Sequence, residues 1–453
     1  MLIATNPYTE QQIAEYPSLS GIHIHEQIQK AHDAFPAWRD KSFAERAQVL
    51  KTIATELRKQ KESLARLMAD EMGKPVKEGG PEVEKAAWCA EHYAEHAEAY
   101  LQSETLQSDA TESYVSYEPL GAVMGILPWN APLWLAFRFM APALMAGNTC
   151  LMKHDPHVPG CAAAIQKLFE SAGAPENIMI NLPLETPDVE VAMRHPNVMA
   201  VSFTGSSEAG AKVATIAGSE IKPTVLELGG SDPFIVMADA DLEKAMDVAT
   251  LSRIINAGQS CIAAKRILVE ASVYDAFLEG VKNRLAALKT GDPNEPTTDI
   301  GPLARRDLQQ NLQRQVEQSI EQGATCLLGG TLLEGKGFFY PPTLLTHVHP
   351  DMPVFCEETF GPVMMVMPFE TVDQAVSLAN QSEYGLGAAL WMADTEQAKR
   401  IAQRLYTGQV AINGIVKTDP RLPSGGVKRS GYGRELGPHG IREFVNAKQV
   451  WVK

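Results

Sequence analysis

The sequence predicts an α/β protein with mostly parallel sheets, and two observations support that expectation. From about residue 149 onward, short apolar runs alternate with helical stretches, which is typical of parallel strands joined by crossover helices. After about residue 100 the hydrophobic period changes from the three- and four-residue steps of a helix to the alternation of a strand. Ligands of such folds bind at the carboxyl ends of the strands, so functional residues are expected there.

The expected elements follow in order along the chain. Residues 25–100 are helical in pattern, because apolar residues recur on one face between charges. The next segment, TESYVSYEPLGAVMGILPW, predicts two strands that meet at residues 119–121. Further strands are expected at 149–153, 177–181, 198–206 and 223–230, with a helix over 162–171. A second block begins near residue 231, with helices over 241–257, 273–289 and 304–322, a strand over 265–270, and strands near 325, 342, 364, 388 and 409.

Composition narrows the class of protein. The length of 453 residues allows about three domains, and the net charge of −15 argues against nucleic acid or an anionic membrane as partner. The N-terminus lacks the pattern of a signal peptide, and the most apolar segment, 121–147, is too interrupted by prolines and polar residues to span a membrane. A cytoplasmic protein is therefore expected.

Cysteine and histidine usage gives no sign of a metal site. The six cysteines contain no C-x-x-C, so neither a zinc site nor a disulfide framework is expected and a reducing compartment fits better. His92 and His96 are four residues apart on an expected helix but lack the glutamate of a zincin motif. We expect a polar helix surface there and no bound metal.

Four local patterns could carry chemistry, and each has a plain structural alternative. Cys261 follows Gly-Gln-Ser, which leaves room around a nucleophilic thiol, although most free cysteines are buried core residues. Glu227 ends an apolar strand shortly before two glycines and is either a general base or a solvated turn residue. Residues 203–210 (FTGSSEAG) could cradle a pyrophosphate or simply cap a helix. Asn130, between Pro128 and Pro132, could offer a rigidly placed amide to an oxyanion or could simply be part of a turn.

Taken together, and in this order, these patterns resemble the aldehyde dehydrogenase superfamily over nearly the whole chain. Pro-Trp-Asn, Phe-Thr-Gly-Ser, Glu-Leu-Gly-Gly and Gly-Gln-x-Cys occur in sequence, and Glu227 lies 34 residues before Cys261. Two later segments extend the resemblance, EETFGP at 357–362 and PSGGVKRSG at 423–431.

The resemblance implies a catalytic set and a cofactor. Cys261 is expected to attack the aldehyde carbon, Asn130 and the Cys261 backbone N–H to stabilise the oxyanion, and Glu227 to activate water against the thioester. Lys153 is counted in the catalytic set and also lies along NAD or NADP, near the adenosine ribose. The other expected cofactor contacts are Leu127, Trp129, Thr204, Gly205, Ser206, Leu228, Glu358 and Phe360.

Two departures bear on the cofactor. NAD-preferring relatives commonly carry a glutamate three residues after the lysine, where this chain has Pro156. The missing carboxylate removes repulsion against a 2′-phosphate, so NADP is as plausible as NAD. The segment 182–186, LPLET, stands where relatives usually have a glycine-containing loop, so the adenine edge is expected to differ.

The expected substrate is succinate semialdehyde or a similar carboxylated aldehyde. Arg138 stands eight residues after Asn130 on an apolar helix face, where the resembling succinate-semialdehyde dehydrogenases have an arginine for the distal carboxylate. Lys417 and Arg421 could supply a second positive charge. The alternatives are a dehydrogenase of uncharged or aromatic aldehydes in which Arg138 binds an internal glutamate, a CoA-acylating enzyme, which Glu227 argues against, and an inactive protein that keeps the fold.

The resemblance also implies an architecture: a Rossmann-type cofactor domain, an α/β catalytic domain and a β-arm for oligomerisation. We place the cofactor-binding domain at 1–100 and 121–229, the catalytic domain at 230–436, and the arm at 101–120 and 437–453. Strands outside the βα units leave open edges that another subunit can cover, so a homodimer or homotetramer is expected.

Overall fold

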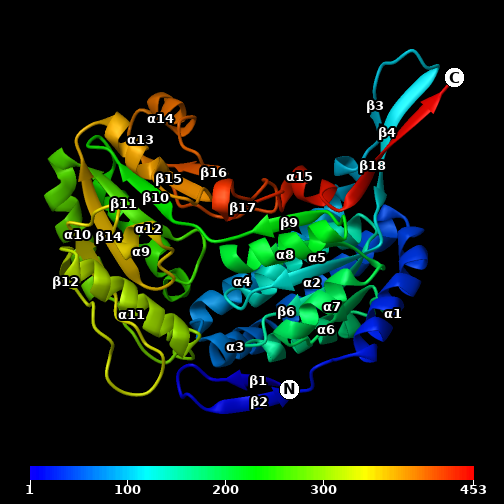
Figure 1. The fold of residues 1–453 in the computed structure, drawn as a ribbon, viewed down its shortest axis with the longest axis horizontal. Coiled ribbons are helices and arrows are strands. Elements are labelled where there is room, and N and C mark those ends of the chain that lie inside the picture. Colours follow the sequence, from blue (N-terminus) through cyan, green and yellow to red (C-terminus); the bar gives the residue numbers. More distant parts are fainter.

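A six-stranded sheet holds the first block of alternating strands and helices in the computed structural model, which describes residues 1–453 (Figure 1). Its strand order is β17-β9-β8-β5-β6-β7, and every pairing except that of β17 is parallel. The strands are β5 (Ala122–Leu127), β6 (Thr149–His154), β7 (Met179–Asn181), β8 (Val198–Thr204), β9 (Thr224–Glu227) and β17 (Gly431–Tyr432).

Helices cover both faces of this sheet because its strands are apolar on both sides. Alternate residues of β5 show this: Val123 and Leu127 join one core, whereas Met124 and Ile126 join the other. The first core is closed by α2 (Phe43–Lys59), α3 (Lys61–Met72), α4 (Val76–Tyr100), α5 (Pro132–Met145) and α6 (Pro159–Ser171). The second is closed by α1 (Ile22–Arg39), α7 (Val189–Arg194) and α8 (Ser207–Ser219).

A seven-stranded sheet forms the second lobe seen in Figure 1. Its order is β12-β13-β14-β11-β10-β15-β16, and only the β12–β13 pair is antiparallel. The strands are β10 (Asp232–Val236), β11 (Ala264–Glu270), β12 (Thr325–Leu328), β13 (Thr343–Thr346), β14 (Val363–Phe369), β15 (Gly387–Trp391) and β16 (Gln409–Ile412). The helices are α9 (Leu242–Ile254), α10 (Tyr274–Ala286), α11 (Arg306–Glu321), α12 (Pro353–Cys356), α13 (Val372–Asn380) and α14 (Thr395–Ala402).

Two small antiparallel sheets complete the fold. In the first, β18 (Val445–Val452) pairs with β4 (Glu112–Pro119) along its whole length, and β3 (Glu104–Thr105) adds a third strand. This sheet projects from the body beside the C-terminus in Figure 1, after the short helix α15 (Gly437–Arg442). The second is a hairpin of β1 (Leu2–Thr5) and β2 (Gln12–Tyr16).

The predicted fold class is confirmed, and three details went beyond the expectation. The β1–β2 hairpin and β10 were not anticipated; β10 is a central strand, but its second residue is a proline, which normally argues against a central strand. Residues 431–432, placed with the catalytic block by the predicted boundaries, hydrogen-bond to β9 of the other sheet. Finally, none of the helices is both long enough and apolar enough to cross a bilayer.

Candidate functional site

The carboxyl ends of β5, β6, β8 and β9 lie along one edge of the six-stranded sheet. The strand register pairs Leu127 with His154 and Thr204 with Glu227, so the segments that follow these strands start from the same edge. Trp129 and Asn130 follow β5, Gly205 and Ser206 follow β8, and Leu228 follows β9. This is the place where open parallel sheets bind their ligands.

Cys261 is held by a turn that departs from helical geometry. Helix α9 ends at Ile254, three residues short of the predicted 257, and a 3₁₀ turn over Ile255–Gly258 follows. Asn256, Ala257 and Gly258 all have left-handed backbones, with φ of 55°, 53° and 76°. Non-glycine residues in this region cost about 1–3 kcal/mol each and persist only where the surroundings fix them.

Two side chains fix that turn. The buried Arg253 guanidinium donates hydrogen bonds of 2.7 Å to the carbonyl oxygens of Gly258 and Gly361. A Cβ on Gly258 would lie 2.3 Å from the Gly361 oxygen, so only glycine fits there. The backbone N–H of Asn256 donates to Glu78 Oε2 of α4 at 2.7 Å. The segment before Cys261 is therefore tied to α4 and to the backbone just before β14.

Asn130 is fixed beside the Cys261 segment by a pair of amide contacts. Its Nδ2 donates to the carbonyl oxygen of Gln259 at 3.1 Å, and Nδ2 of Asn256 donates to the Asn130 carbonyl at 2.8 Å. Helix α5 begins two residues later, and Glu82 Oε1 accepts from the free N–H groups of Leu133 and Trp134 at 3.0 and 3.2 Å. The predicted amide thus contacts the residue two positions before Cys261, and these contacts hold the amide rigidly.

The electrostatic surroundings of Cys261 oppose and assist ionisation at once. Burial raises the pKa of the Cys261 thiol to about 12, the nearby charges of Arg138 and Lys265 lower that pKa, and Glu358 and Glu227 raise it. The Lys265 Nζ donates to the carbonyl oxygens of Ser260 and Cys261 at 2.9 and 2.7 Å and lies 3.3 Å from Glu358 Oε1. A fixed positive charge therefore lies directly behind the cysteine.

Glu227 shares a buried arginine with a second carboxylate, Glu435. The side chains of Arg138, Glu227 and Glu435 are 3%, 4% and 4% exposed. Arg138 Nη2 lies 3.7 Å from Glu227 Oε2, Arg138 Nε pairs with Glu435, and Ser202 donates to Glu435 at 3.2 Å. Burial raises the pKa of Glu227 to about 8 against the lowering effect of Arg138, and it also raises the pKa of Glu435.

Glu227 keeps one free oxygen. Its Oε1 is buried and has no hydrogen-bond partner, and a Cβ on Gly425, whose φ is +153°, would lie 2.8 Å from it. The strand β17 brings the 425–435 segment here, because Gly431 pairs with Glu227 itself. An unpartnered carboxylate oxygen with a raised pKa suits a general base that is active once it ionises.

The predicted cofactor contacts lie along the same edge. Lys153 is buried and forms no ion pair, so its ammonium is free for an anion. Ser206 caps α8 by accepting from the Ala209 N–H at 3.2 Å, and Leu228 packs so closely on this helix that a Cβ on Gly210 would reach it at 2.5 Å. This packing fixes the start of α8, and the free N–H groups of a helix start suit a phosphate.

Glu358 and Phe360 border the edge from the second lobe. Glu358 Oε1 accepts from the Gly230 N–H at 3.0 Å, and the Phe360 ring meets Trp129 edge-on at a centroid distance of 5.8 Å. The two predicted halves of the cofactor site are thus in contact.

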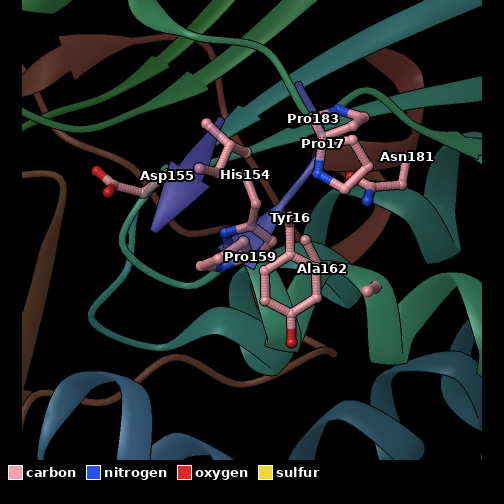
Figure 2. Close-up of a pocket in the computed structure, with 10 residues that line it drawn as sticks. Tyr16, Pro17, His154, Asp155, Pro159, Ala162, Asn181 and Pro183 are labelled. Carbon is pink, nitrogen blue, oxygen red and sulfur yellow. The ribbon is translucent and has the colours of Figure 1, made fainter. Parts of the chain in front are cut away.

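Beyond Lys153, a cavity of about 180 Å³ lies where the N-terminal hairpin meets the end of β6. Figure 2 shows Tyr16 and Pro17 from the hairpin beside His154, Pro159 and Ala162. Asp155 is the only carboxylate in the lining, and it accepts a hydrogen bond from the His157 N–H at 3.0 Å. No carboxylate occupies position 156, as the sequence indicated.

The three predicted substrate residues have different settings. Arg138 faces Glu435 and Glu227, the internal arrangement that the sequence left open, and its role toward a substrate carboxylate stays a prediction. Arg421 is exposed and bound at two points to Asp419, at 2.9 and 2.6 Å, above the Trp88 ring. Lys417 is exposed.

One face of α4 carries residues that sequence reasoning missed. Glu78 binds Asn256, Glu82 caps α5, and Lys85 donates to Thr418 Oγ1 at 2.7 Å. Residues 78, 82 and 85 lie on one face of a helix because they are spaced four and three residues apart. Charged residues on a helix face that packs against an apolar helix are unusual, and this was the signal in the sequence that could have identified them. Glu435 and Lys265 were also missed, because only the tertiary fold brings them to the site.

The His92–His96 pair is part of an aromatic stack. The rings lie 4.5 Å apart, His96 Nδ1 contacts the His92 carbonyl, and His92 Nε2 contacts the Tyr100 hydroxyl at 3.1 Å. No group of three or more His, Cys, Asp or Glu side chains is arranged to hold a metal ion.

Comparison with known proteins gives matches over the full length of the chain. The sequence model of the aldehyde dehydrogenase family matches residues 2–450. A Synechocystis protein described as a probable succinate-semialdehyde dehydrogenase (NADP+) is 46% identical over 453 residues, covering 100% of both chains. A succinate-semialdehyde dehydrogenase (NADP+) of Mycobacterium bovis is 44% identical over 456 residues, again with 100% of both chains covered. The crystal structure of a Streptococcus pyogenes succinic semialdehyde dehydrogenase in complex with NADP+ superimposes with a TM-score of 0.97 at 32% identity over 100% of each chain.

Proposed function

The chain belongs to the aldehyde dehydrogenase family, and from that premise we propose that it oxidises succinate semialdehyde to succinate with NADP+. The observation that carries the proposal is the convergence of Asn130, Glu227 and the Cys261 segment: Gln259 and Asn256 hydrogen-bond to Asn130, and the charges of Glu227 and its partner Arg138 act on the Cys261 thiol. The balanced reaction is aldehyde, NADP+ and water to carboxylate, NADPH and two protons.

In the first step we assign Cys261 as the nucleophile. Its thiolate adds to the aldehyde carbon, so that a carbon–sulfur bond forms and the carbonyl oxygen takes the negative charge. The Asn130 amide and the Cys261 backbone N–H donate to that oxygen, and each such donor is worth about 10²–10³ in rate. The positive charges of Arg138 and Lys265 offset the effect of burial on the thiol.

The bound dinucleotide supplies the hydride acceptor, and the acyl group remains on Cys261 as a thioester. Glu227 then removes a proton from water through its free Oε1 while the water oxygen adds to the thioester carbon. The carbon–sulfur bond breaks, the acid leaves, and Cys261 returns as a thiolate. The buried Arg138 and Glu435 hold Glu227 in place for this step.

The cofactor fits the residues present. The unpaired, buried Lys153 suits the ribose and phosphate end of the dinucleotide, and the start of α8 at Ser206 suits the pyrophosphate. Glu358 and Phe360 border the nicotinamide ribose, while Leu127, Trp129, Thr204, Gly205 and Leu228 line the remainder of the edge. Pro156, in place of a carboxylate, favours the 2′-phosphate of NADP, in agreement with the names of the full-length relatives.

For the architecture we propose the predicted units: a cofactor-binding domain of 1–100 and 121–229, a catalytic domain of 230–436 and an arm of 101–120 and 437–453. The open edges of the β18-β4-β3 sheet support a homodimer or homotetramer. The six cysteines are all unpaired, which supports a cytoplasmic setting.

A second candidate, a dehydrogenase of uncharged or aromatic aldehydes, is favoured by one observation, the internal partners of Arg138. Steady-state kinetics on a panel of aldehydes with each cofactor separates the two. We expect kcat/KM for succinate semialdehyde to exceed that for pentanal by about 100-fold with NADP+; equal values for the two aldehydes would favour the second candidate.

A further inference from the structure

Lys85 is a half-buried cation without a counter-ion that lies against α5, the helix that follows Asn130. Its Nζ donates to the Thr418 hydroxyl at 2.7 Å and lies 4.2 Å from the centroid of the Trp134 ring. It forms no ion pair, whereas a buried ammonium normally has a carboxylate partner. A negative group is therefore missing from its surroundings.

The nearest carboxylates are already bound elsewhere. Glu82 pairs with Lys74 and accepts the N–H groups at the start of α5, and Asp419 is held at two points by Arg421. Burial and the charge of Arg138 lower the pKa of Lys85 to about 8, although Cys89, Glu82 and Asp419 act in the opposite direction. The protein thus keeps a positive charge here without neutralising it.

Arg138, the other buried cation nearby, is neutralised from within. It meets both Glu435 and Glu227, and a substrate carboxylate at the same guanidinium would bring a third acidic group to one positive charge. Lys85 has no such competition. Between the two, Lys85 is the better receptor for an incoming anion.

The place of Lys85 suits the proposed substrate. Trp134 lies in the first turn of α5, which begins two residues after Asn130, and Arg138 lies one turn further along the same helix. The carbonyl and carboxylate carbons of succinate semialdehyde lie about 4 Å apart when the chain is extended. A substrate whose carbonyl meets Asn130 and Cys261 can therefore direct its carboxylate toward the Trp134 ring, over which the Lys85 ammonium sits.

We propose that Lys85 is the specificity-determining residue that binds the distal carboxylate of the aldehyde. The Thr418 hydroxyl accepts from Lys85, which leaves its own proton free to donate to the same carboxylate. The Trp134 face supports the methylene carbons of the substrate. This inference rests on the proposed function and deepens it by naming the group that recognises the acid.

The test compares Lys85→Met, Lys85→Arg and Lys51→Met with the wild type on succinate semialdehyde and on pentanal, which lacks the carboxylate. Methionine keeps the packing on Trp134, and Lys51 is an exposed lysine on α2 that controls for the loss of one charge. We expect Lys85→Met to lower kcat/KM for succinate semialdehyde about 100-fold and to leave pentanal within about 3-fold. Lys85→Arg should recover most of the loss, and Lys51→Met should match the wild type.

A binding measurement without turnover completes the test. Succinate should protect Cys261 from iodoacetamide in the wild type, and Lys85→Met should need about 100-fold more succinate for the same protection. Equal losses on both aldehydes, or unchanged preference in Lys85→Met, would overturn the role of Lys85. A wild type that shows no preference for succinate semialdehyde over pentanal would instead refute the proposed function.

Discussion

The Nδ2 of Asn256 donates a 2.8 Å hydrogen bond to the backbone carbonyl of Asn130, so the residue that shapes the cysteine turn also holds the proposed oxyanion donor. The two residues are 126 positions apart and belong to different lobes. Asn256 has φ 55°, a conformation that asparagine adopts more readily than most residues. One side chain thus couples the geometry of the nucleophile to that of the amide.

Replacing Asn256 tests this coupling. Asn256→Gly keeps the left-handed backbone but removes the amide, and we expect kcat/KM to fall about 100-fold because the reacting groups lose their alignment. Asn256→Ala should fall further, since alanine also strains the turn. Steady-state kinetics with thermal melting as a stability control makes the measurement. Wild-type activity in Asn256→Gly would show that the amide contact is dispensable.

Glu227→Gln should separate the two halves of the reaction. The first hydride transfer needs Cys261, Asn130 and the cofactor but not the base, whereas hydrolysis needs the base, so we expect a burst of one NADPH per active site followed by a rate lower by about 10²–10⁴. Rapid-mixing absorbance at the NADPH band follows both phases, and mass spectrometry should find the acyl group on the protein. Loss of the burst itself would assign Glu227 to the first step.

The pH dependence of hydrolysis follows from the same residue. The pKa of Glu227 is raised to about 8, so at pH 7 most of it is protonated and unable to act as a base. The hydrolysis rate should therefore increase with pH and level off above about pH 8. The apparent pKa of this inflection belongs to the Glu227–Glu435 pair. Single-turnover decay of the acyl-enzyme measures it, and the residual rate of Glu227→Gln should lack this inflection.

Arg138→Met tests whether the arginine serves the protein or the substrate. Removing it leaves two buried carboxylates without their counter-ion, so we expect the free energy of unfolding to drop by about 3–5 kcal/mol. Activity should fall equally on succinate semialdehyde and pentanal, because the pKa of both Cys261 and Glu227 would rise. A loss confined to the carboxylated aldehyde would instead support the role that the sequence predicts for Arg138. Arg138→Lys, which keeps the charge, should be less affected in both respects.

Pro156→Glu tests the proposed cofactor preference. A carboxylate three residues after Lys153 can accept hydrogen bonds from the ribose hydroxyls of NAD and repels the 2′-phosphate of NADP. We expect the ratio of kcat/KM for NADP+ over NAD+ to fall at least about 10-fold, mainly through the KM of NADP+. The matched control is Pro156→Gln, which should change the ratio much less. An unaltered ratio in the glutamate variant would place the 2′-phosphate elsewhere.

The sheets were predictable because hydrophobic alternation is a local property of each strand. Val123 and Met124 pack into separate cores, and that two-sided burial gives β5 its apolar sequence. The β10 strand escaped prediction because Pro233 follows two glycines and an acidic residue, and its strand state depends on pairing with β11 and β15. Pairing partners far along the chain leave no local pattern.

Only the site residues that lie within a sequence motif could be predicted. Cys261, Glu227 and Asn130 each lie in a recognisable run of residues, whereas Lys85 and Glu435 act through contacts 333 and 233 positions distant in sequence. The α4 face that carries Glu78, Glu82 and Lys85 reads as an ordinary charged helix until α5 is placed against it. Charge on a helix becomes informative once its neighbours are known.

The antiparallel strand β17 brings a late part of the chain to the proposed base. Gly431 must pair with Glu227, and Glu435 must reach Arg138, before the proposed base has its surroundings. On the ribosome, the cysteine, the amide and the base are therefore all synthesised long before the segment that completes them. A chain that lacks its last few dozen residues would keep Cys261, Asn130 and Glu227, the proposed catalytic side chains, but would lose the strand and the carboxylate that surround Glu227 and Arg138, so we expect its activity to be lost.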